Sequence, residues 1–328
     1  MERKNVTEYA LGYMNSYTSM MTAYQLMSGW RVINDQDQLD KCHLYIIASR
    51  PNSYFIADSL KYDGKLLSGQ IGYKVSGVEH RVDFNDFSFE LSDGAIEIRC
   101  DYPFRELWTY NSTGEQTHYL PATHFASILS AHKSDGVLNR FEVLYVGQAI
   151  GQGNRSAQQR LTSHSTFQKI LALSAHDKPD NELVVFMFQF DHEQMFTSMD
   201  GRASGAIADD SNEKRLMGAI RNPPEKKQKI AMVEAGLIRY FQPFYNEIFK
   251  IKFPSTKHKT LLSCKNLDVS ALIVELDTSD LGFTLWSPTV KANNHHTARY
   301  DLVNLENRMS FFNLTGVAEF PGVIKTEK

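Results

Sequence analysis

The chain has few cysteines and no long apolar run. Its three cysteines, Cys42, Cys100 and Cys264, stand far apart without a Cys-x-x-Cys pair, which argues against a disulfide framework or a structural zinc site. No stretch approaches the roughly 18 apolar residues of a membrane-spanning helix, and the N-terminus MERKNVTEYALG lacks the apolar core of a signal peptide. We therefore expect a cytoplasmic protein that does not enter a membrane.

An excess of charge of one sign is also lacking. The 35 basic and 38 acidic residues give a net charge of -3, so phosphate would have to be attracted by a local basic patch. Hydrophobic residues make up 42% of the 328 residues and charged residues 22%, which is typical of a globular protein with two or three units. No repeat recurs at a fixed period.

The first part of the chain is predicted to be rich in β-strands. A helix is expected over residues 7–27, where Tyr, Leu and Met recur at helical spacing. From Leu44 onward, short alternating or apolar segments predict an antiparallel sheet or a small sandwich over 44–110, with a hairpin turning at Gly94. The polar run at 111–114 marks a boundary. Residues 1–115 are thus predicted to form an N-terminal domain for recognition or partner binding.

Residues 116–250 are predicted to form a compact unit in the order β-β-α-β-α. Its expected elements are strands in ATHFASILS and FEVLYVG, a helix over 156–175, a strand over 182–190 and a helix over 223–241 that Pro243 ends. Residues 191–225 are interpreted as an insertion that could act as a lid. Beyond it, ALIVELD and FTLWSPTV predict strands in an extension over 251–328. The predicted fold class is α+β.

The helix over 156–175 carries a polar face. Arg160, His164 and Gln168 are spaced by four residues and so share one side of the helix. A glycine-containing loop, GQGNRS, precedes it and would let the backbone approach a phosphate, which an arginine can bind through two donors. The alternative is an ordinary solvated face.

Glu234 lies within an apolar stripe of the later helix. Its neighbours one turn away are Ile230, Val233, Leu237 and Ile238. A carboxylate there loses hydration unless a cation or several donors meet it, and Mg²⁺ prefers carboxylate oxygen. The alternative is an ion pair with an arginine at the edge of the core, such as Arg160.

Two further residues could complete a site. Tyr145 ends the apolar run VLYVG, where its phenol could accept a proton or position water at the rim of a groove. Asn246, just after Pro243, could orient Glu234 or the backbone. The alternatives are a packed strand tyrosine and a turn residue.

As a set, these motifs resemble the GIY-YIG nuclease superfamily over residues 121–250. The matching segments are YVGQA for the second strand motif, R-x-x-x-H on the first helix, E-A-x-L-I on the later helix and P-x-Y-N after it. The resemblance implies a small three-stranded antiparallel sheet flanked by helices. It also implies catalytic roles for Tyr145, Arg160, His164, Glu234 and Asn246, with one Mg²⁺ or Mn²⁺ on Glu234.

The first family motif, Gly-Ile-Tyr or a variant, departs from this pattern. We expect it on the strand before YVG, but ATHFASILS contains no tyrosine. The nearest candidates are Phe125 and His124. If the missing phenol is the essential base, then Tyr145, His124 or His164 must replace it.

The resemblance leads to a prediction of function. We expect an endonuclease that hydrolyses nucleic acid, DNA rather than RNA, in restriction or antiviral defence, with a homodimer as one way to cut both strands. Its expected contacts to nucleic acid are Gly147, Gln148, Arg155, Lys226, Lys227 and Lys229. The alternatives are a solvated face for these lysines and, for the whole unit, an inactive nucleic-acid-binding or protein-interaction module.

Overall fold

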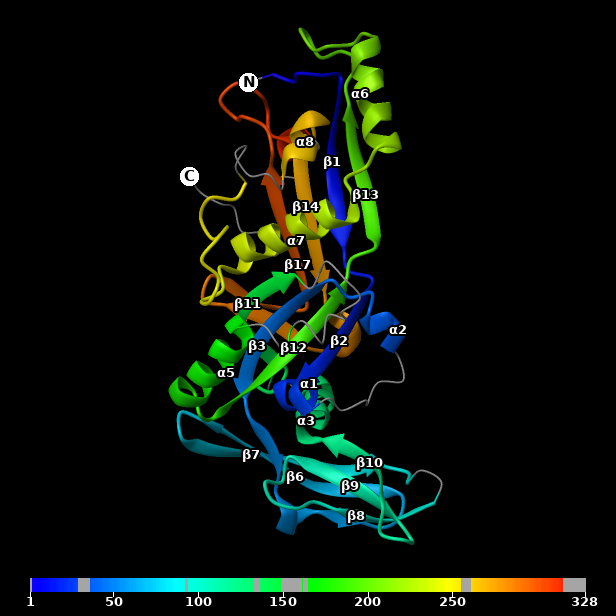
Figure 1. Ribbon diagram of the computed structural model, residues 1–328, viewed down its shortest axis with the longest axis vertical. Helices are drawn as coiled ribbons and strands as arrows, with labels where there is room; N and C mark the ends of the chain where they lie inside the picture. Colours follow the sequence, from blue (N-terminus) through cyan, green and yellow to red (C-terminus); the bar gives the residue numbers. More distant parts are fainter. Residues whose placement is uncertain are drawn as a thin grey trace.

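The computed structural model describes residues 2–28, 36–91, 94–132, 136–148, 161, 165–254 and 261–314. Its sheets follow one another along the long axis of the molecule (Figure 1): an upper sheet, a central sheet and a lower β domain. Of the helices in these residues, none is both long and apolar enough to cross a membrane.

The upper sheet has four strands in the order β13 (His192–Met199), β1 (Thr7–Met14), β14 (Ala271–Asp277) and β17 (His295–Asp301). Only β1 and β14 run parallel; the other neighbours are antiparallel. β1 is an inner strand whose residues are buried on both faces. This explains why its sequence lacks a clean alternation.

The central sheet has six strands. Their order is β16 (Val290–Asn293), β15 (Thr284–Ser287), β11 (Arg140–Gln148), β3 (Leu44–Pro51), β12 (Asn181–Gln189) and β2 (Tyr17–Thr22). β3 pairs antiparallel with both β11 and β12, and β15 runs parallel to β11. The three middle strands therefore come from segments far apart in the sequence.

The lower β domain is inserted between β3 and β11. It contains β4 (Ser53–Phe55), η1 (Ala57–Ser59), β5 (Lys61–Tyr62), β6 (Leu66–Val75), β7 (Val78–Ser88), β8 (Ala95–Arg99), β9 (Glu106–Asn111), β10 (Gln116–Pro121) and α3 (Ala122–His132). β6 pairs with β4, β5 and β7, whereas β8, β9 and β10 form a second, antiparallel sheet. Phe55, Phe84, Leu107 and Phe125 belong to its separate core.

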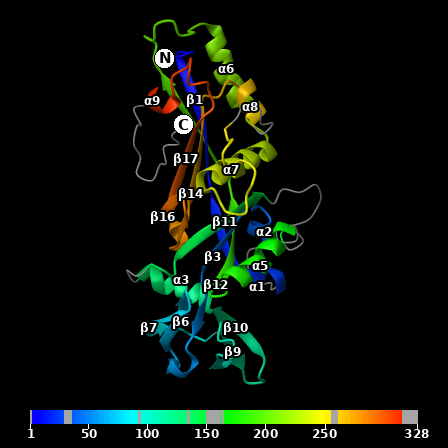
Figure 2. The same cartoon turned by 90° about the vertical axis from the view of Figure 1, so that its left-hand side faces the viewer.

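The helices cover both faces of the central sheet. α7 (Lys226–Phe241) packs with one face and with the upper sheet in the largest core, whereas α5 (Ser165–Asp177) packs on the other face. The remaining helical segments are α1 (Ala23–Ser28), α2 (Gln36–Leu39), α6 (Asp210–Arg221), α8 (Leu262–Asn266), η3 (Ser279–Leu281) and α9 (Phe311–Leu314). In both views α7 lies over the end of β11 (Figure 2).

Several predicted elements are confirmed. The chain has the mixed helix and sheet content of the expected α+β class, with mainly antiparallel pairing. The helix expected over 223–241 is α7, and the strands expected over 182–190, in ALIVELD and in FTLWSPTV are β12, β14 and β15.

Other predictions are wrong. The expected helix over 7–27 is two strands and a single helical turn, because β1 and β2 are paired into two different sheets. β7 and β8 do not form a hairpin with each other, since each pairs within its own sheet. ATHFASILS is helix α3 and not a strand. The insertion over 191–225 supplies β13 and α6, so part of it belongs to the upper sheet.

The predicted boundaries at 115 and 250 do not coincide with the sheets. β1 pairs with β13 and β14, and β3 pairs with β11 and β12, so residues before 52 belong to the upper and central sheets. The segment that stands apart is the insertion between β3 and β11.

Candidate active site

Helix α7 is held firmly at both ends and along its length. Glu225 and Gln228 form a capping box at its start, and Gln242 ends it in the left-handed conformation. At Gly236 the helix approaches the upper sheet so closely that an added Cβ would lie 3.1 Å from Val274 Cγ2. The Tyr300 hydroxyl donates to the Gly236 carbonyl at 2.6 Å. The side chains of α7 therefore project from a fixed position.

Glu234 lies on this helix beside the end of β11. Burial raises the pKa of its carboxyl to about 7, and a hydrogen bond from the Gln148 backbone N–H offsets part of that shift. Within the described part of the chain, no cationic side chain forms an ion pair with Glu234. Its charge is thus compensated by one peptide donor.

One phenol, that of Tyr145, interacts with this carboxyl, and a second, that of Tyr45, hydrogen-bonds the first. Tyr145 on β11 is half-buried, and its pKa is raised by burial and by the negative charge of Glu234. The Tyr45 phenol on β3 hydrogen-bonds Tyr145 and lowers that pKa in part. The two ring centroids are 6.0 Å apart. Because Tyr145 pairs with Tyr45 and the Gln148 N–H three residues along β11 binds Glu234, the two tyrosines and Glu234 gather at the end of β11.

Gly147 makes room for this arrangement. It lies opposite Tyr45 in the β11–β3 register. A Cβ at position 147 would lie 2.6 Å from Cζ and Oη of Tyr45 and 2.7 Å from Cε1 of Tyr145. No side chain fits there, so the glycine of the YVG motif is needed for the close approach of the phenols rather than for a turn.

Asn246 fixes the strand that carries Tyr145. Its Oδ1 accepts from the Val146 N–H at 2.9 Å, and its Nδ2 donates to the Val146 carbonyl at 2.8 Å. The side chain is 7% exposed. The amide therefore continues the hydrogen bonding of the sheet at the edge of β11, and both of its polar groups are used in positioning the strand.

The structure thus brings together five of the residues singled out in the sequence: Tyr145, Gly147, Gln148, Glu234 and Asn246. Arg155, Arg160 and His164 lie outside the described residues. Gln168, which was expected to share their helix face, is exposed on α5.

The two candidates for the first family motif are placed elsewhere. Phe125 is fully buried in the core of the lower β domain, where it packs edge-on against Phe84 at 4.7 Å. Burial lowers the pKa of His124, which hydrogen-bonds the Met20 backbone. Both belong to helix α3, so neither lies on the strand beside YVG. The expectation that the first motif lies in a strand formed by ATHFASILS is wrong.

Tyr45 is the residue that the sequence reasoning missed. Its strand, β3, is the neighbour of β11 in the sheet but lies far upstream of YVG in the sequence, because the lower β domain is inserted between β3 and β11. The available signal was a tyrosine within an apolar, β-branched run. Considering every predicted strand upstream of YVG, and not only the nearest one, would have identified Tyr45 as a candidate.

The predicted basic residues differ in their surroundings. Lys226 and Lys227 are exposed at the start of α7. Lys229 forms an ion pair with Glu193, and its ammonium lies 5.9 Å from the centroid of the Tyr13 ring. Burial lowers its pKa. Lys226 and Lys227 are thus available to a phosphate backbone, whereas Lys229 is engaged within the fold.

The cluster has one residue suited to a metal ion. No group of three or more His, Cys, Asp and Glu side chains that could hold a metal occurs among the residues described. A lone carboxylate nevertheless fits Mg²⁺, which keeps several of its waters and uses one or two carboxylates together with substrate phosphates. The uncompensated burial of Glu234 is the observation in favour, since a cation would relieve it.

Comparisons of this chain with protein-family models, with curated proteins and with solved structures found no match. The functional argument therefore depends on the geometry of the cluster formed by Tyr45, Tyr145, Gly147, Gln148, Glu234 and Asn246.

Proposed function

We propose that this chain is a metal-dependent endonuclease that hydrolyses the phosphodiester bonds of nucleic acid, DNA in particular. The observation that carries the proposal is the convergence of Glu234 with two phenols at one end of β11. Among the described residues this half-buried carboxylate has no cationic partner, which a fold alone does not need, and perturbed groups of this kind cluster at functional sites.

The arrangement of strands supports the resemblance to GIY-YIG nucleases. β11, β3 and β12 are antiparallel neighbours with β3 in the middle, and α5 and α7 pack on opposite faces. In this interpretation Tyr45 of HLYII takes the place of the first-motif tyrosine, and Tyr145 that of the second. The first motif is then on β3 and the second on β11, with the lower β domain inserted between them. The strand directly before YVG in the sequence is not needed for the resemblance.

We assign each residue of the cluster a separate role in phosphodiester hydrolysis. Glu234 would hold the divalent ion, which when bound supplies Lewis-acid stabilisation of the charge that develops on the phosphate. The raised pKa of Tyr145 keeps its phenol protonated at neutral pH, so we assign it to orienting water or a phosphate oxygen by hydrogen bonding. Tyr45 orients Tyr145, and Asn246 holds the backbone between Tyr145 and Gly147.

The proposed biological role is restriction or antiviral defence, on fold-level analogy. The lower β domain and the upper sheet provide surfaces outside the catalytic unit for recognition of a substrate. A homodimer would supply two sites for the two strands of a duplex.

Cleavage of supercoiled plasmid DNA and of single-stranded RNA, with Mg²⁺ or Mn²⁺ and with a chelator, tests the proposal. We expect metal-dependent products from the wild-type protein and a loss on the order of 10³-fold for Glu234→Gln. Glu213→Gln, on distant α6, is the matched control and should cleave at the wild-type rate. Tyr45→Phe and Tyr145→Phe should each slow cleavage while leaving the circular dichroism spectrum unchanged.

Two results would contradict the proposal. Full activity of Glu234→Gln would exclude the assigned metal ligand. Binding of nucleic acid by the wild-type protein without products under any metal condition would leave only the alternative, an inactive binding module.

A further inference from the structure

A cavity of about 630 Å³ lies between the central sheet and the lower β domain. Its walls include Tyr24 of α1, the loop residue Tyr102, Glu106, Trp108 and Tyr110 of β9, and Glu182 of β12. Cavities that bind small molecules typically measure roughly 300–1,000 Å³. No residue of the cluster around Glu234 lines it.

Three of the cavity residues belong to β9, whose side chains alternate between its two faces. Leu107 and Thr109 point into the lower domain and are at most 2% exposed. Glu106, Trp108 and Tyr110 occupy the other face of the strand and line the cavity. That face therefore presents two aromatic rings and a carboxylate in a row.

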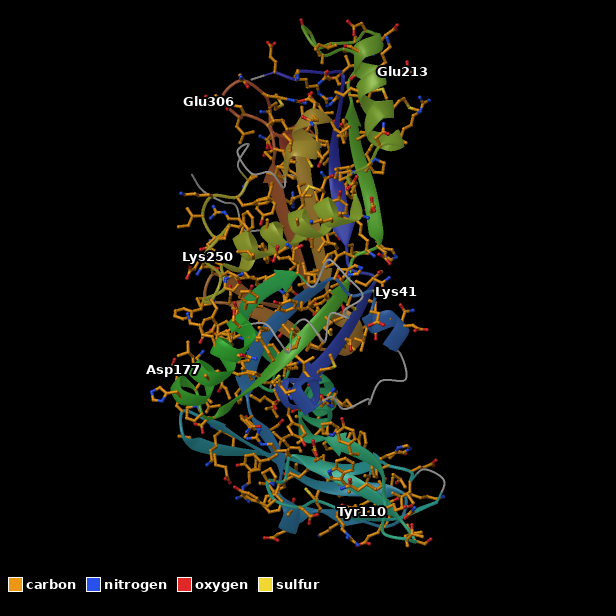
Figure 3. All side chains as sticks on the ribbon, viewed as in Figure 1. Lys41, Tyr110, Asp177, Glu213, Lys250 and Glu306 are labelled. Atoms are coloured by element: carbon orange, nitrogen blue, oxygen red, sulfur yellow. The ribbon has the colours of Figure 1, made fainter. Side chains whose placement is uncertain are left out.

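The rings on this face are held in fixed positions. Trp108 stacks on Tyr119 of β10 with centroids 4.8 Å apart, and the Arg99 guanidinium lies 4.5 Å from the centroid of Tyr110 (Tyr110 is labelled in Figure 3). Gln25 of α1 donates to the Tyr119 hydroxyl at 2.7 Å, which ties the two walls together. Two more aromatic side chains are exposed at the cavity, Tyr24 at 62% and Tyr102 at 86%. Aromatic side chains arranged in this way are suited to stacking a flat ring.

The two glutamates of the cavity differ in what they can still bind. Glu182 uses both oxygens within the fold: Oε1 accepts from the fully buried Arg50 at 2.8 Å and Oε2 from the Thr123 hydroxyl at 2.6 Å. Glu106 accepts from Trp108 Nε1 at 3.1 Å through Oε2. Its other oxygen has no partner among the described residues, so Glu106 is an oriented acceptor.

We propose that this cavity binds an amino-substituted nucleobase of the adenine or cytosine type, stacked on the aromatic side chains and hydrogen-bonded through its amino group to Glu106. A carboxylate accepts from the exocyclic amino group of such a base, whereas a uracil or thymine edge offers a carbonyl at the same place. The acidic lining, with Asp101, Glu106 and Glu182 against Arg105, favours a base over a phosphate.

The base can come from two sources, a free nucleoside or a nucleotide extruded from a strand. The second source rests on the proposed nuclease function. Arg50, opposite Glu182 in the sheet, is five residues along β3 from Tyr45, which corresponds to roughly 17 Å. At about 3.4 Å per nucleotide step, a base in the cavity would lie about five steps from the phosphodiester that is cut.

Equilibrium binding of adenosine, cytidine and uridine, and of single-stranded oligonucleotides rich in each base, tests the proposal. The protein carries Glu234→Gln and the buffer contains no divalent ion, so that cleavage does not interfere. We expect adenosine or cytidine to bind about tenfold more tightly than uridine, and Glu106→Gln to remove that preference. Tyr102→Ala, at an exposed position where folding is not at risk, should weaken binding of every base. Glu213→Gln is the control.

The outcomes separate this proposal from the proposed function. Base preference in both arms supports the cavity with a free nucleoside as ligand, and preference in the oligonucleotide arm alone supports an extruded base. Equal binding of all bases, or binding that neither Glu106→Gln nor Tyr102→Ala changes, overturns the cavity proposal even if the wild-type protein cleaves DNA. Base-selective binding by a protein that cleaves nothing overturns the nuclease function and keeps the cavity.

Discussion

Glu8 of the upper sheet and Glu234 of the candidate active site are both glutamates set among buried apolar residues, but their surroundings differ. Glu8 is 1% exposed and accepts hydrogen bonds from the Ser270 hydroxyl at 2.6 Å, from the Asn5 backbone N–H at 3.1 Å and from Arg308. Glu234 has one donor among the described residues, the backbone N–H of Gln148.

The pKa shifts of the two carboxyls have opposite signs. Burial alone would raise the pKa of Glu8, but Arg308, Ser270 and Asn5 together lower it below the usual value. Burial raises the pKa of Glu234 to about 7 because no comparable set of donors meets it. A carboxylate that is fully paired stabilises the fold, whereas one left unpaired is available to a ligand. The predictions below test this difference, starting with the largest expected effect.

Glu8→Gln should destabilise the protein by about 3 kcal/mol at neutral pH, because it removes one of the two carboxylates paired with Arg308 and leaves only Asp268. Urea unfolding at pH 7 measures this change. Glu213→Gln on α6 serves as the control and should change the free energy of unfolding by less than about 0.5 kcal/mol. A similarly small effect for Glu8→Gln would mean that the ion pair with Arg308 does not contribute to the free energy of unfolding. The contrast between Glu8 and Glu234 would then be contradicted.

Glu234→Gln should have the opposite effect in the absence of divalent ions, a gain on the order of 3 kcal/mol at pH 8. The folded pKa of about 7 exceeds the ordinary 4.5, so the contribution of Glu234 to stability is fully present below pH 4.5 and is lost as pH rises through 7. The difference between the variant and the wild type should therefore vanish near pH 4.5.

Glu8 should show the reverse dependence on pH. Its folded pKa lies below the ordinary value, so its contribution is present above about pH 4.5 and is lost as pH falls through the folded pKa. Urea unfolding of both variants between pH 3 and 8 compares the two windows. If the effects of the two substitutions on the free energy of unfolding changed with pH in the same direction, the distinction between the two carboxyls would be contradicted.

Gly147→Ala should destabilise the protein by about 2 kcal/mol, because a Cβ at this position overlaps Tyr45 and Tyr145. It should also abolish the hydrogen bond between the phenols and slow cleavage. Gly218→Ala in α6 is the matched control: no atom lies within 4 Å of its added Cβ, and alanine favours a helix by roughly 0.5–1 kcal/mol. Equal effects of the two substitutions on thermal unfolding would exclude the steric argument.

The smallest expected effect concerns the lysines of α7. Replacing Lys226 and Lys227 by Gln should lower the slope of log K against log salt for DNA binding by about two, because each exposed lysine releases about one counterion. Lys229→Gln should leave the slope nearly unchanged, since Glu193 already neutralises Lys229. A fluorescence anisotropy titration at several salt concentrations measures both. Equal slopes for all three proteins would mean that the basic helix start does not contact DNA.

Local sequence patterns predicted the helices and strands that bury one face, because their apolar residues recur at regular spacing. α7 was predicted from Pro224 before it and from its apolar stripe, and the uncompensated environment of Glu234 was apparent from Ile230, Val233, Leu237 and Ile238. Asn246 was expected to orient the site, but its pairing with the Val146 backbone needs the fold to be known.

The failures have a physical cause in long-range pairing. TEYALGYM carries apolar residues at spacings that fit a helix, but β1 lies between two strands and is buried on both faces, so packing overrides the pattern. Likewise, Tyr45 meets Tyr145 only because β3 and β11 pair across the inserted domain. Local sequence does not show which strands pair across such distances.

The most direct test of the central claim is a pH titration of the Glu234 carboxyl itself, followed by carbon NMR and assigned by its absence in Glu234→Gln. Without metal the midpoint should lie near 7, and saturating Mg²⁺ should lower it, because a cation favours the ionised form. A midpoint in the ordinary glutamate range, or one that Mg²⁺ does not move, would contradict the assignment of Glu234 as an unpaired carboxylate available to a divalent ion.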